Sequence, residues 1–275
     1  MKKLLLGFSV IGQFAFAQDY HITYNFRFKE DSLSSNYTNK NYVLQVEKDK
    51  TKFILKDLIS NNKILESNTK MFYNLPMEQV VSHPRNTDDY INYNVIFQNY
   101  YSYPSNDPIV WEIKNDTKEE NTYKLQKAIT RFGGRQWEAW FIPEIPIMEG
   151  PFKFRALPGL IYEVKDNNDN FAYELIEVKK LDTTYDTSNI IETHFGIKPI
   201  AITRKKFVQL IVDGYKNPYS EYRSMKPGTW SINPDQNRKI DNIKDLDIYA
   251  KEVQEQTRKK NNPVELSKAI HFPLK

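Results

Sequence analysis

Apolar and polar side chains alternate along most of the chain, which predicts a protein built mainly of strands. Between residues 20 and 29, tyrosine, isoleucine and phenylalanine occupy every second position, and polar residues such as His21 and Arg27 lie between them. This period of two is typical of a strand with one face on a core and the other in water. The same criterion predicts strands at residues 42–47, 51–56, 63–66, 90–98, 123–131, 135–142, 160–164 and 171–178, and the start of another at 111–113.

Polar and proline-containing segments predict the connections between these strands. We expect residues 48–50 to form a hairpin turn and residues 116–120 another turn. Residues 103–108 contain two prolines and are predicted as a loop, because proline cannot donate to a strand ladder. Residues 166–170 should form a tight polar turn that brings 171–178 back beside 160–164.

The pattern changes to a helical one near residue 201. Thr203 is placed to cap a helix over residues 204–215, in which apolar residues recur on one stripe. Asp247 is placed to cap a second helix over residues 248–260, and the region between, 217–240, reads as loop. The chain therefore ends in a tail that is more helical than the rest.

The charge balance also changes at this point. Residues 201–275 carry 15 Lys and Arg against 9 Asp and Glu, a balance of +6, whereas residues 18–200 carry 22 against 26, a balance of −4. A basic tail is typical of contact with an anionic surface or an acidic partner. A solvated helix face explains the same excess, and the sequence leaves both interpretations open.

Composition agrees with a strand-rich globular protein. Hydrophobic residues make up 40% of the chain and aromatic residues 14%, and aromatic side chains favour strands. We predict a β-dominated α+β protein: a large, curved, antiparallel sheet, which could form an open or half barrel, with one or two C-terminal helices. Residues 18–275 are predicted to form a single domain with its basic tail starting at about residue 201.

The N-terminus has the pattern of a secretory signal peptide over residues 1–17. Lys2 and Lys3 precede a short apolar run, and Ala15-Phe16-Ala17 forms a small-x-small cleavage site. The run is too short to cross a bilayer, so no transmembrane segment is predicted. We expect export to the periplasm or beyond, with Gln18 as the mature N-terminus. The chain has no cysteine, which excludes a lipoprotein anchor and disulfides.

Residues 131–164 are the segment richest in residues that constrain the backbone. Gly133-Gly134 allows positive φ at a joint, and Pro143 with Pro146 should end the strand at 135–142. Residues 152–156 alternate at period two, which predicts a further short strand. Pro158-Gly159 suits a type II turn, with positive φ at Gly159.

This segment resembles the GLPGLI family of exported Bacteroidetes proteins. The naming motif stands here as residues 156–161, with Ala156 in place of the first glycine, which makes a close backbone approach there less essential. The resemblance implies an exported β-rich protein without an agreed biochemical activity, and mainly structural roles for its motif. The matching residues are Gly134, Glu144, Pro146, Gly150, Pro151, Leu157, Pro158, Gly159, Leu160 and Ile161.

No familiar catalytic or cofactor pattern is present in the sequence. The four histidines lie far apart, without the H-E-x-x-H spacing of a zinc protease, and the G-x-S-x-G, P-loop and Rossmann patterns are all absent. We therefore predict no catalytic residues, no metal ligands, no cofactor and no nucleic-acid site. The alternative is a hydrolase whose carboxylate or His-carboxylate site these patterns do not capture. The carboxylates nearest the central segment are Glu138, Glu144, Glu149 and Glu163.

A binding role is the preferred function. Arg135, Trp137, Trp140 and Phe152 combine arginine with large aromatic rings, the types that dominate binding hot spots. We predict that they form a concave surface for a hydrophobic or extended partner. Core packing of the tryptophans, and an internal ion pair of Arg135 with Glu138 or Glu144, are the alternatives. The family setting implies an outer-membrane transporter or another envelope protein as partner, and the sequence predicts no oligomeric state.

Overall fold

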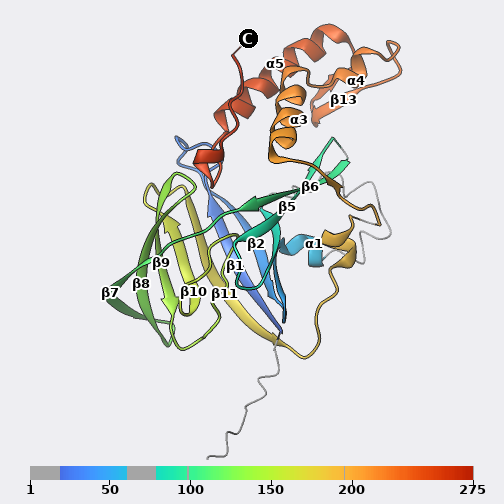
Figure 1. Cartoon of the computed structure of the whole chain (residues 1–275). Helices are drawn as coiled ribbons and strands as arrows, with labels where there is room; N and C mark the ends of the chain where they lie inside the picture. The colour runs from blue at the N-terminus through green and yellow to red at the C-terminus, as the bar shows by residue number, and fades with distance from the viewer. Residues whose placement is uncertain (1–18, 61–78, 98, 195, 275) are drawn as a thin grey trace, which may run out of the picture.

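The computed structural model describes residues 19–60, 79–97, 99–194 and 196–274. Within them the chain is a β-dominated α+β protein, with one large open sheet and helices gathered near the C-terminus (Figure 1). The predicted fold class is thus confirmed. The predicted signal peptide and the predicted strand at 63–66 lie outside the described residues.

The large sheet contains twelve strands of the described residues, and every neighbouring pair is antiparallel apart from the parallel pair at one edge. This edge is formed by two residues that follow the long connection from β11. In spatial order the strands are β12 (Ile200–Ala201), β6 (Asn99–Asn106), β5 (Asp89–Ile96), β4 (Val80–Pro84), β3 (Lys50–Leu55), β2 (Thr38–Val46), β1 (Asp19–Phe28), β11 (Phe171–Leu181), β10 (Leu160–Asp166), β9 (Arg135–Ile142), β8 (Tyr123–Phe132) and β7 (Glu112–Glu120).

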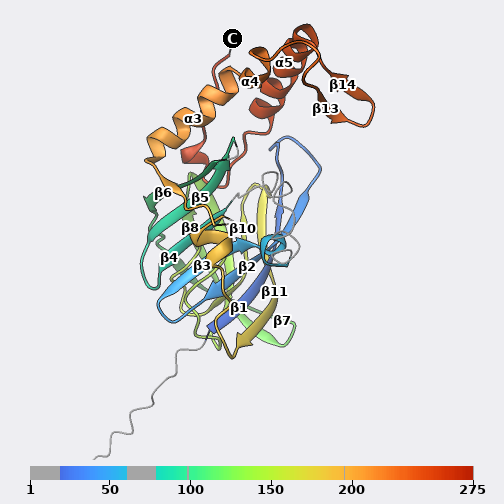
Figure 2. The same cartoon turned by 90° about the vertical axis from the view of Figure 1, so that its right-hand side faces the viewer.

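The sheet curls around a single large core, so that its two halves face each other (Figures 1 and 2). Ile22, Tyr24 and Phe26 of β1 point into this core, as the alternation predicted. Aromatic rings fill its centre: Phe26 stacks on Tyr173 with ring centroids 4.4 Å apart. Rings of this size bury large apolar areas, which makes them the main source of stability in the core.

A loop, residues 143–159, crosses the concave side of the sheet between β9 and β10. Its Phe154 is fully buried and packs edge-on against Trp137, with ring centroids 4.6 Å apart. Tyr90 of β5 donates to the Lys153 carbonyl oxygen at 3.1 Å, which joins the loop to the opposite half of the sheet. The predicted strand at 152–156 is therefore wrong: this segment is part of an irregular loop, in which the consecutive side chains of residues 152–155 are all buried.

Gly159 does not adopt the predicted positive φ. A Cβ built there would lie 2.3 Å from the Ile142 carbonyl oxygen, so glycine is needed for close backbone contact and not for a type II turn. Positive φ occurs instead at Ala156, at +72°. The position at which the GLPGLI motif has its first glycine is thus the one where the backbone favours glycine.

Two predicted loops are strands in the structure. Residues 103–106 belong to β6, where Pro104 lies opposite Ile91 and beyond the two residues that pair with β12. Proline is tolerated there because no further strand needs its missing N–H. Residues 116–120 complete β7, and the turn follows at residues 121–122. β7 is an exposed edge strand, and its many charged side chains discourage edge-to-edge pairing with another sheet.

The C-terminal helices form a lobe beyond one end of the curled sheet (Figures 1 and 2). Thr203 caps its first helix as predicted, accepting from the Lys206 backbone N–H at 3.1 Å. The last long helix starts earlier than predicted, because Asn242 caps it and not Asp247. The lobe contains α3 (Arg204–Lys216), α4 (Ser220–Arg223), the hairpin β13 (Ile232–Asp235) and β14 (Arg238–Ile240), α5 (Ile243–Lys259) and the 3-10 helix η3 (Leu266–Lys268).

The lobe has a small core of its own around Trp230, Ile240 and Leu246. Its hairpin and α4 lie within the region predicted as loop, whose proline, asparagine and glycine content obscured them. Two short elements complete the fold: α1 (Lys56–Ser60) follows β3, and the π-helix η2 (Ser188–Glu192) lies in the connection from β11 to β12.

Candidate binding cleft

A cleft of about 690 Å³ lies where the rim of the curled sheet meets the C-terminal lobe. Its walls come from β1, β11 and the loop 143–159 on the sheet side, and from α3 and residues 260–270 on the other. We call residues 260–270 the C-terminal strap. Six aromatic side chains and a larger set of charged and amide groups line the cleft: Phe26, Phe28, Tyr103, Phe152, Phe171 and Phe207, with Glu30, Lys40, Gln79, Asn94, Arg204, Lys260, Asn261, Asn262, Glu265 and Lys268.

The hairpin turn between β8 and β9 positions the strap. Gly133 and Gly134 have φ of +59° and +80°, as expected for a glycine pair in a tight turn. A Cβ on Gly133 would lie 2.8 Å from the Glu265 Cα, and the Ser267 N–H donates to the Gly133 carbonyl oxygen at 2.9 Å. Glycine is therefore required twice here, for the turn itself and for the approach of the strap.

Arg135 holds the strap from beneath. Its guanidinium group donates to the Asn262 side chain at 2.6 Å and to the backbone carbonyl oxygens of Pro263 and Val264 at 2.9 and 3.1 Å. It also pairs with the buried Asp166 at 3.4 Å. The predicted internal ion pair exists, but its partner is Asp166 and neither Glu138 nor Glu144. These contacts hold the strap at a fixed position relative to the sheet.

Buried charges join the strap to the loop formed by residues 143–159, which we call the inner loop. The Lys153 ammonium group, 1% exposed, lies 2.7 Å from an Asp107 oxygen and 2.8 Å from a Glu265 oxygen. Lys268 contacts the same two carboxylates from the strap. Two cations and two anions thus alternate in a closed ring, which we call the Lys153 ring. Full compensation of this kind is what makes buried charge tolerable.

The Lys153 ring favours the charged forms of Asp107 and Lys268. Burial alone would raise the pKa of Asp107, but the Lys153 ammonium group lowers this pKa below its ordinary value. Burial alone would lower the pKa of Lys268, but the Glu265 and Asp107 carboxylates raise it. Both shifts move the pKa of the group further from neutral pH, so Asp107 and Lys268 serve structure and not acid-base chemistry.

The four predicted binding residues do not form one surface. Trp137 is 1% exposed, in the core, and its indole donates to the Phe132 carbonyl oxygen at 3.0 Å. Trp140 lies on the outer face of the sheet, beneath Lys118 and beside Glu138. Phe152 lines the cleft. Arg135 does not line it but binds the strap, which forms one of its walls.

The residues that match the GLPGLI family form two groups, one buried and one exposed. Leu157, Leu160 and Ile161 are core residues, and a Cβ on Gly150 would lie 2.3 Å from the Phe154 carbonyl oxygen. These residues are accounted for by packing of the loop. Pro151 is also buried, and Gly159 makes the close approach described above. A Cβ on Gly134 would lie 3.0 Å from the Ser267 backbone nitrogen, so this glycine also faces the strap. The exposed members are Gly134, Glu144, Pro146 and Pro158.

A His-carboxylate pair exists elsewhere, inside the protein. His83 lies 3.5 Å from Glu149, which is 1% exposed and also accepts from Arg155 at 3.2 Å. Arg155 pairs in turn with Asp88 at 2.8 Å. Burial lowers the pKa of His83, although the Glu149 carboxylate opposes this effect. None of these side chains lines the cleft, and their contacts pin the inner loop to the β4–β5 turn.

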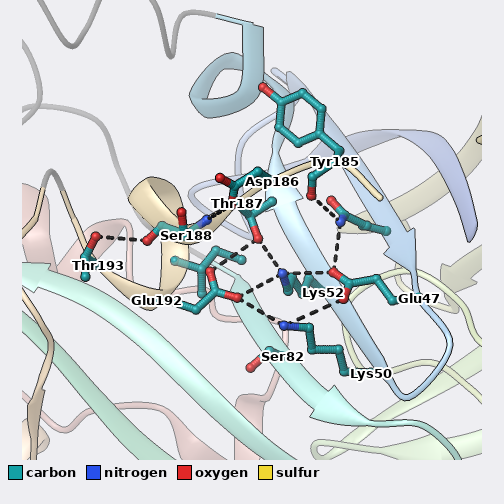
Figure 3. Close-up of polar contacts among 12 residues, drawn as sticks. Glu47, Lys50, Lys52, Ser82, Tyr185, Asp186, Thr187, Ser188, Glu192 and Thr193 are labelled. Carbon is teal, nitrogen blue, oxygen red and sulfur yellow. Dashed lines mark hydrogen bonds and ion pairs between the residues drawn. The ribbon is translucent and has the colours of Figure 1, made fainter. Parts of the chain in front are cut away.

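A second buried lysine, Lys52 of β3, forms a comparable cluster (Figure 3). Its ammonium group lies 2.9 Å from both Glu47 and Glu192, and it donates to the Thr187 hydroxyl. Gln45 continues the network to the Tyr185 carbonyl oxygen at 2.8 Å. The cluster fastens residues 182–194, which we call the η2 segment, to β2 and β3.

Sequence reasoning missed the Lys153 ring. Lys153 stands between Phe152 and Phe154, an alternation that predicts a strand with Lys153 on its polar face and gives no signal that the charge is buried. Its partners are 46 and 112 positions away, so no spacing rule connects them. Over the described residues, no group of three or more His, Cys, Asp or Glu side chains is arranged to hold a metal ion. In the same residues, no helix has the length and apolar character needed to cross a membrane.

Residues 82–163 match a family described as a protein of unknown function (Porph_ging). The matched segment runs from β4 to β10 and includes the β8–β9 turn and the inner loop that carries Lys153. No curated protein matches the chain.

Two crystal forms of PNGF-II, in space groups C2 and P21, resemble the chain in fold. Each has a TM-score of 0.52, at 19% and 18% sequence identity, over 71% of this chain and 33% of PNGF-II. The matched region is therefore about a third of the length of PNGF-II. At this level of identity the likeness shows the fold alone.

Proposed function

We propose that this protein is a non-catalytic binding protein of the bacterial envelope, and that its ligand occupies the cleft beneath the C-terminal strap. The cleft carries the proposal: its volume lies in the range of about 300–1,000 Å³ typical of small-molecule sites. Aromatic rings form a continuous apolar wall on its sheet side, and charged and amide groups lie around it. That combination binds and orients a small molecule.

The arrangement favours binding over catalysis. The lining residues in the described part of the chain include no histidine. Of the two lining carboxylates, Glu265 is paired within the Lys153 ring and Glu30 lies 2.6 Å from Lys260. A hydrolase needs a nucleophile or a base that can change its protonation state. The His83–Glu149 pair, which is the best candidate for such chemistry, is buried away from the cleft.

The location of this function is proposed from the sequence. The signal-peptide pattern at residues 1–17 supports export to the periplasm, and the resemblance of residues 156–161 to the GLPGLI motif supports an envelope protein. On that basis we propose an outer-membrane transporter or another envelope protein as the partner that gives or receives the ligand. Cell fractionation with N-terminal sequencing tests the location: a cytoplasmic species that still begins at Met1 contradicts it.

The binding function is tested by blocking the cleft. Ala269 is half-buried in the lining, so Ala269→Trp should fill the cleft, whereas Ala201 is exposed and not in the lining, so Ala201→Trp is the matched control. Protein purified from its native envelope is analysed by native mass spectrometry for bound small molecules. We expect a ligand in the wild type and the control and none in Ala269→Trp. Equal occupancy in both variants, or no ligand in any, contradicts the proposal.

A further inference from the structure

We propose that the ligand of the cleft is an amphipathic anion, a molecule with one alkyl chain and a negatively charged head group. This inference rests on the binding function proposed above and goes beyond it by naming the chemical class. It follows from the arrangement of apolar and charged groups in the lining.

The sheet side of the cleft is suited to an alkyl chain. Phe26 and Phe28 stack with ring centroids 4.8 Å apart, and Phe26 lies parallel to Phe171 at 6.0 Å. Phe152 of the inner loop extends this wall, and all four side chains are buried. Phenylalanine offers no hydrogen bond, so this wall recognises its ligand by apolar contact alone.

The charged side chains of the lining carry an excess of positive charge. Four of them are cationic and two are anionic, a balance of +2. Burial raises the pKa of Tyr103 to about 12, so its phenol remains neutral and does not offset this charge at neutral pH. The cationic members are Lys40, Arg204, Lys260 and Lys268.

Arg204 is the residue best placed to receive the head group. Among the described residues its guanidinium group makes one hydrogen bond, to the Lys268 carbonyl oxygen at 2.7 Å, and no ion pair. Five N–H donors in a planar fork suit a carboxylate or a phosphate. Arg204 begins α3, one turn before the cleft-lining Phe207, so charge and ring are held on the same rigid element.

The test compares amphiphiles with the same chain and different heads. Dodecanoate, dodecyl phosphate and dodecyltrimethylammonium are titrated into the full-length mature protein by isothermal calorimetry, below their micelle concentrations. We expect both anions to bind at least about tenfold more tightly than the cation, since one ion pair in a partly buried site is worth that much. The tighter of the two anions distinguishes a carboxylate source from a phosphate-bearing lipid fragment.

Variants assign the charge preference to Arg204. Arg204→Gln should weaken dodecanoate binding by about tenfold and leave dodecyltrimethylammonium unchanged. Arg204→Lys should restore most of the preference. Lys205→Gln, an exposed neighbour outside the lining, is the control and should bind as the wild type does. Circular dichroism of each variant confirms that the fold is kept.

Three outcomes overturn the inference. In the first, the anionic and cationic amphiphiles bind with equal affinity and Ala269→Trp abolishes the binding of both. The cleft then binds apolar ligands without charge selection, and the proposed binding function stands. In the second, the Arg204→Gln variant still prefers anions, which means that the head group does not bind at Arg204. Absence of binding of all three probes excludes this ligand class, and the mass spectrometry of the native protein then decides the binding function separately.

Discussion

Two segments return to the sheet late in the chain, and a buried lysine holds each of them. Lys153 is bound by Asp107 and Glu265 and secures the C-terminal strap, and Lys52 is bound by Glu47 and Glu192 and secures the η2 segment. The charge chemistry is nearly the same. The surroundings differ, because Glu265 and Lys268 also line the aromatic cleft, whereas no residue of the Lys52 cluster does.

This difference shows that a buried ion cluster is not by itself a sign of function. Both clusters solve one structural problem, which is to attach an irregular segment to a sheet whose own hydrogen bonds are already used. What separates them is the apolar space beside the strap. We therefore place the proposed function at the cleft and not at either ion cluster, and the Lys153 ring holds the strap that forms one wall of the cleft.

The largest expected effect comes from removing each lysine. Lys153→Met leaves Asp107 and Glu265 with Lys268 as their one shared cation, and Lys52→Met leaves Glu47 and Glu192 with the more exposed Lys50. Each loss of a buried cation should lower the free energy of unfolding by about 3–5 kcal/mol. Urea midpoints measure this. Only Lys153→Met should also abolish ligand binding at temperatures where both variants are folded. Loss of binding in Lys52→Met as well would end the distinction between the two regions.

Two glycine-to-alanine substitutions, at Gly196 and Gly133, separate the cost of backbone strain from the cost of displacing the strap. Gly196, close to the η2 segment, has φ of +80°, and a Cβ added there would have no atom of the described residues within 4 Å, so Gly196→Ala should cost about 1 kcal/mol. Gly133→Ala adds a collision with the strap, since its Cβ would lie 2.8 Å from the Glu265 Cα. Overpacking should raise its cost by about a further 1–3 kcal/mol. Equal thermal shifts would show that the strap does not rest on this turn.

Low pH should weaken the attachment of the strap and that of the η2 segment, and it should weaken the attachment of the strap more. The pKa of Asp107 and that of Glu192 are both lowered in the folded state: burial opposes this in each, and the neighbouring lysines outweigh it. A lowered carboxyl pKa contributes stability above the unfolded-state value of about 4, and the contribution is lost as pH falls through the folded-state value. Asp107 is 7% exposed, whereas the Glu192 side chain is 40% exposed and screened by solvent.

The measurement is the unfolding midpoint between about pH 6 and pH 2. Asp107→Asn should flatten this dependence more than Glu192→Gln does. A steeper loss in Asp107→Asn than in the wild type would show that Asp107 does not carry the acid sensitivity of the strap.

The smallest expected effect concerns the inner loop that carries Lys153. Ala156 has φ of +72°, where glycine is more favourable, so Ala156→Gly should stabilise the protein by about 0.5–1 kcal/mol after the entropy cost of glycine. Calorimetric melting temperatures test this. A decrease would mean that the Ala156 methyl group contributes packing that outweighs the backbone strain.

Local pattern alone determined much of the fold. Alternation along residues 20–29 and 135–142 predicted β1 and β9, because a strand exposes its two faces in turn. The Thr203 cap and the Gly133-Gly134 turn were also predictable, since each depends on the backbone preferences of one or two residues. Pro143 ended β9 as expected, for lack of an N–H.

Tertiary structure decided the rest. Trp137 and Trp140 alternate on one strand, and only the curl of the sheet determines which of them meets the core. Gly159 is required by the approach of Ile142, a contact between strands that no turn rule describes. Lys153 finds Asp107 and Glu265 because the inner loop and the strap cross the same end of the sheet. The cleft therefore could not be read from the sequence: its walls come from distant segments, and local preferences fix the conformation of each segment but not which segments meet.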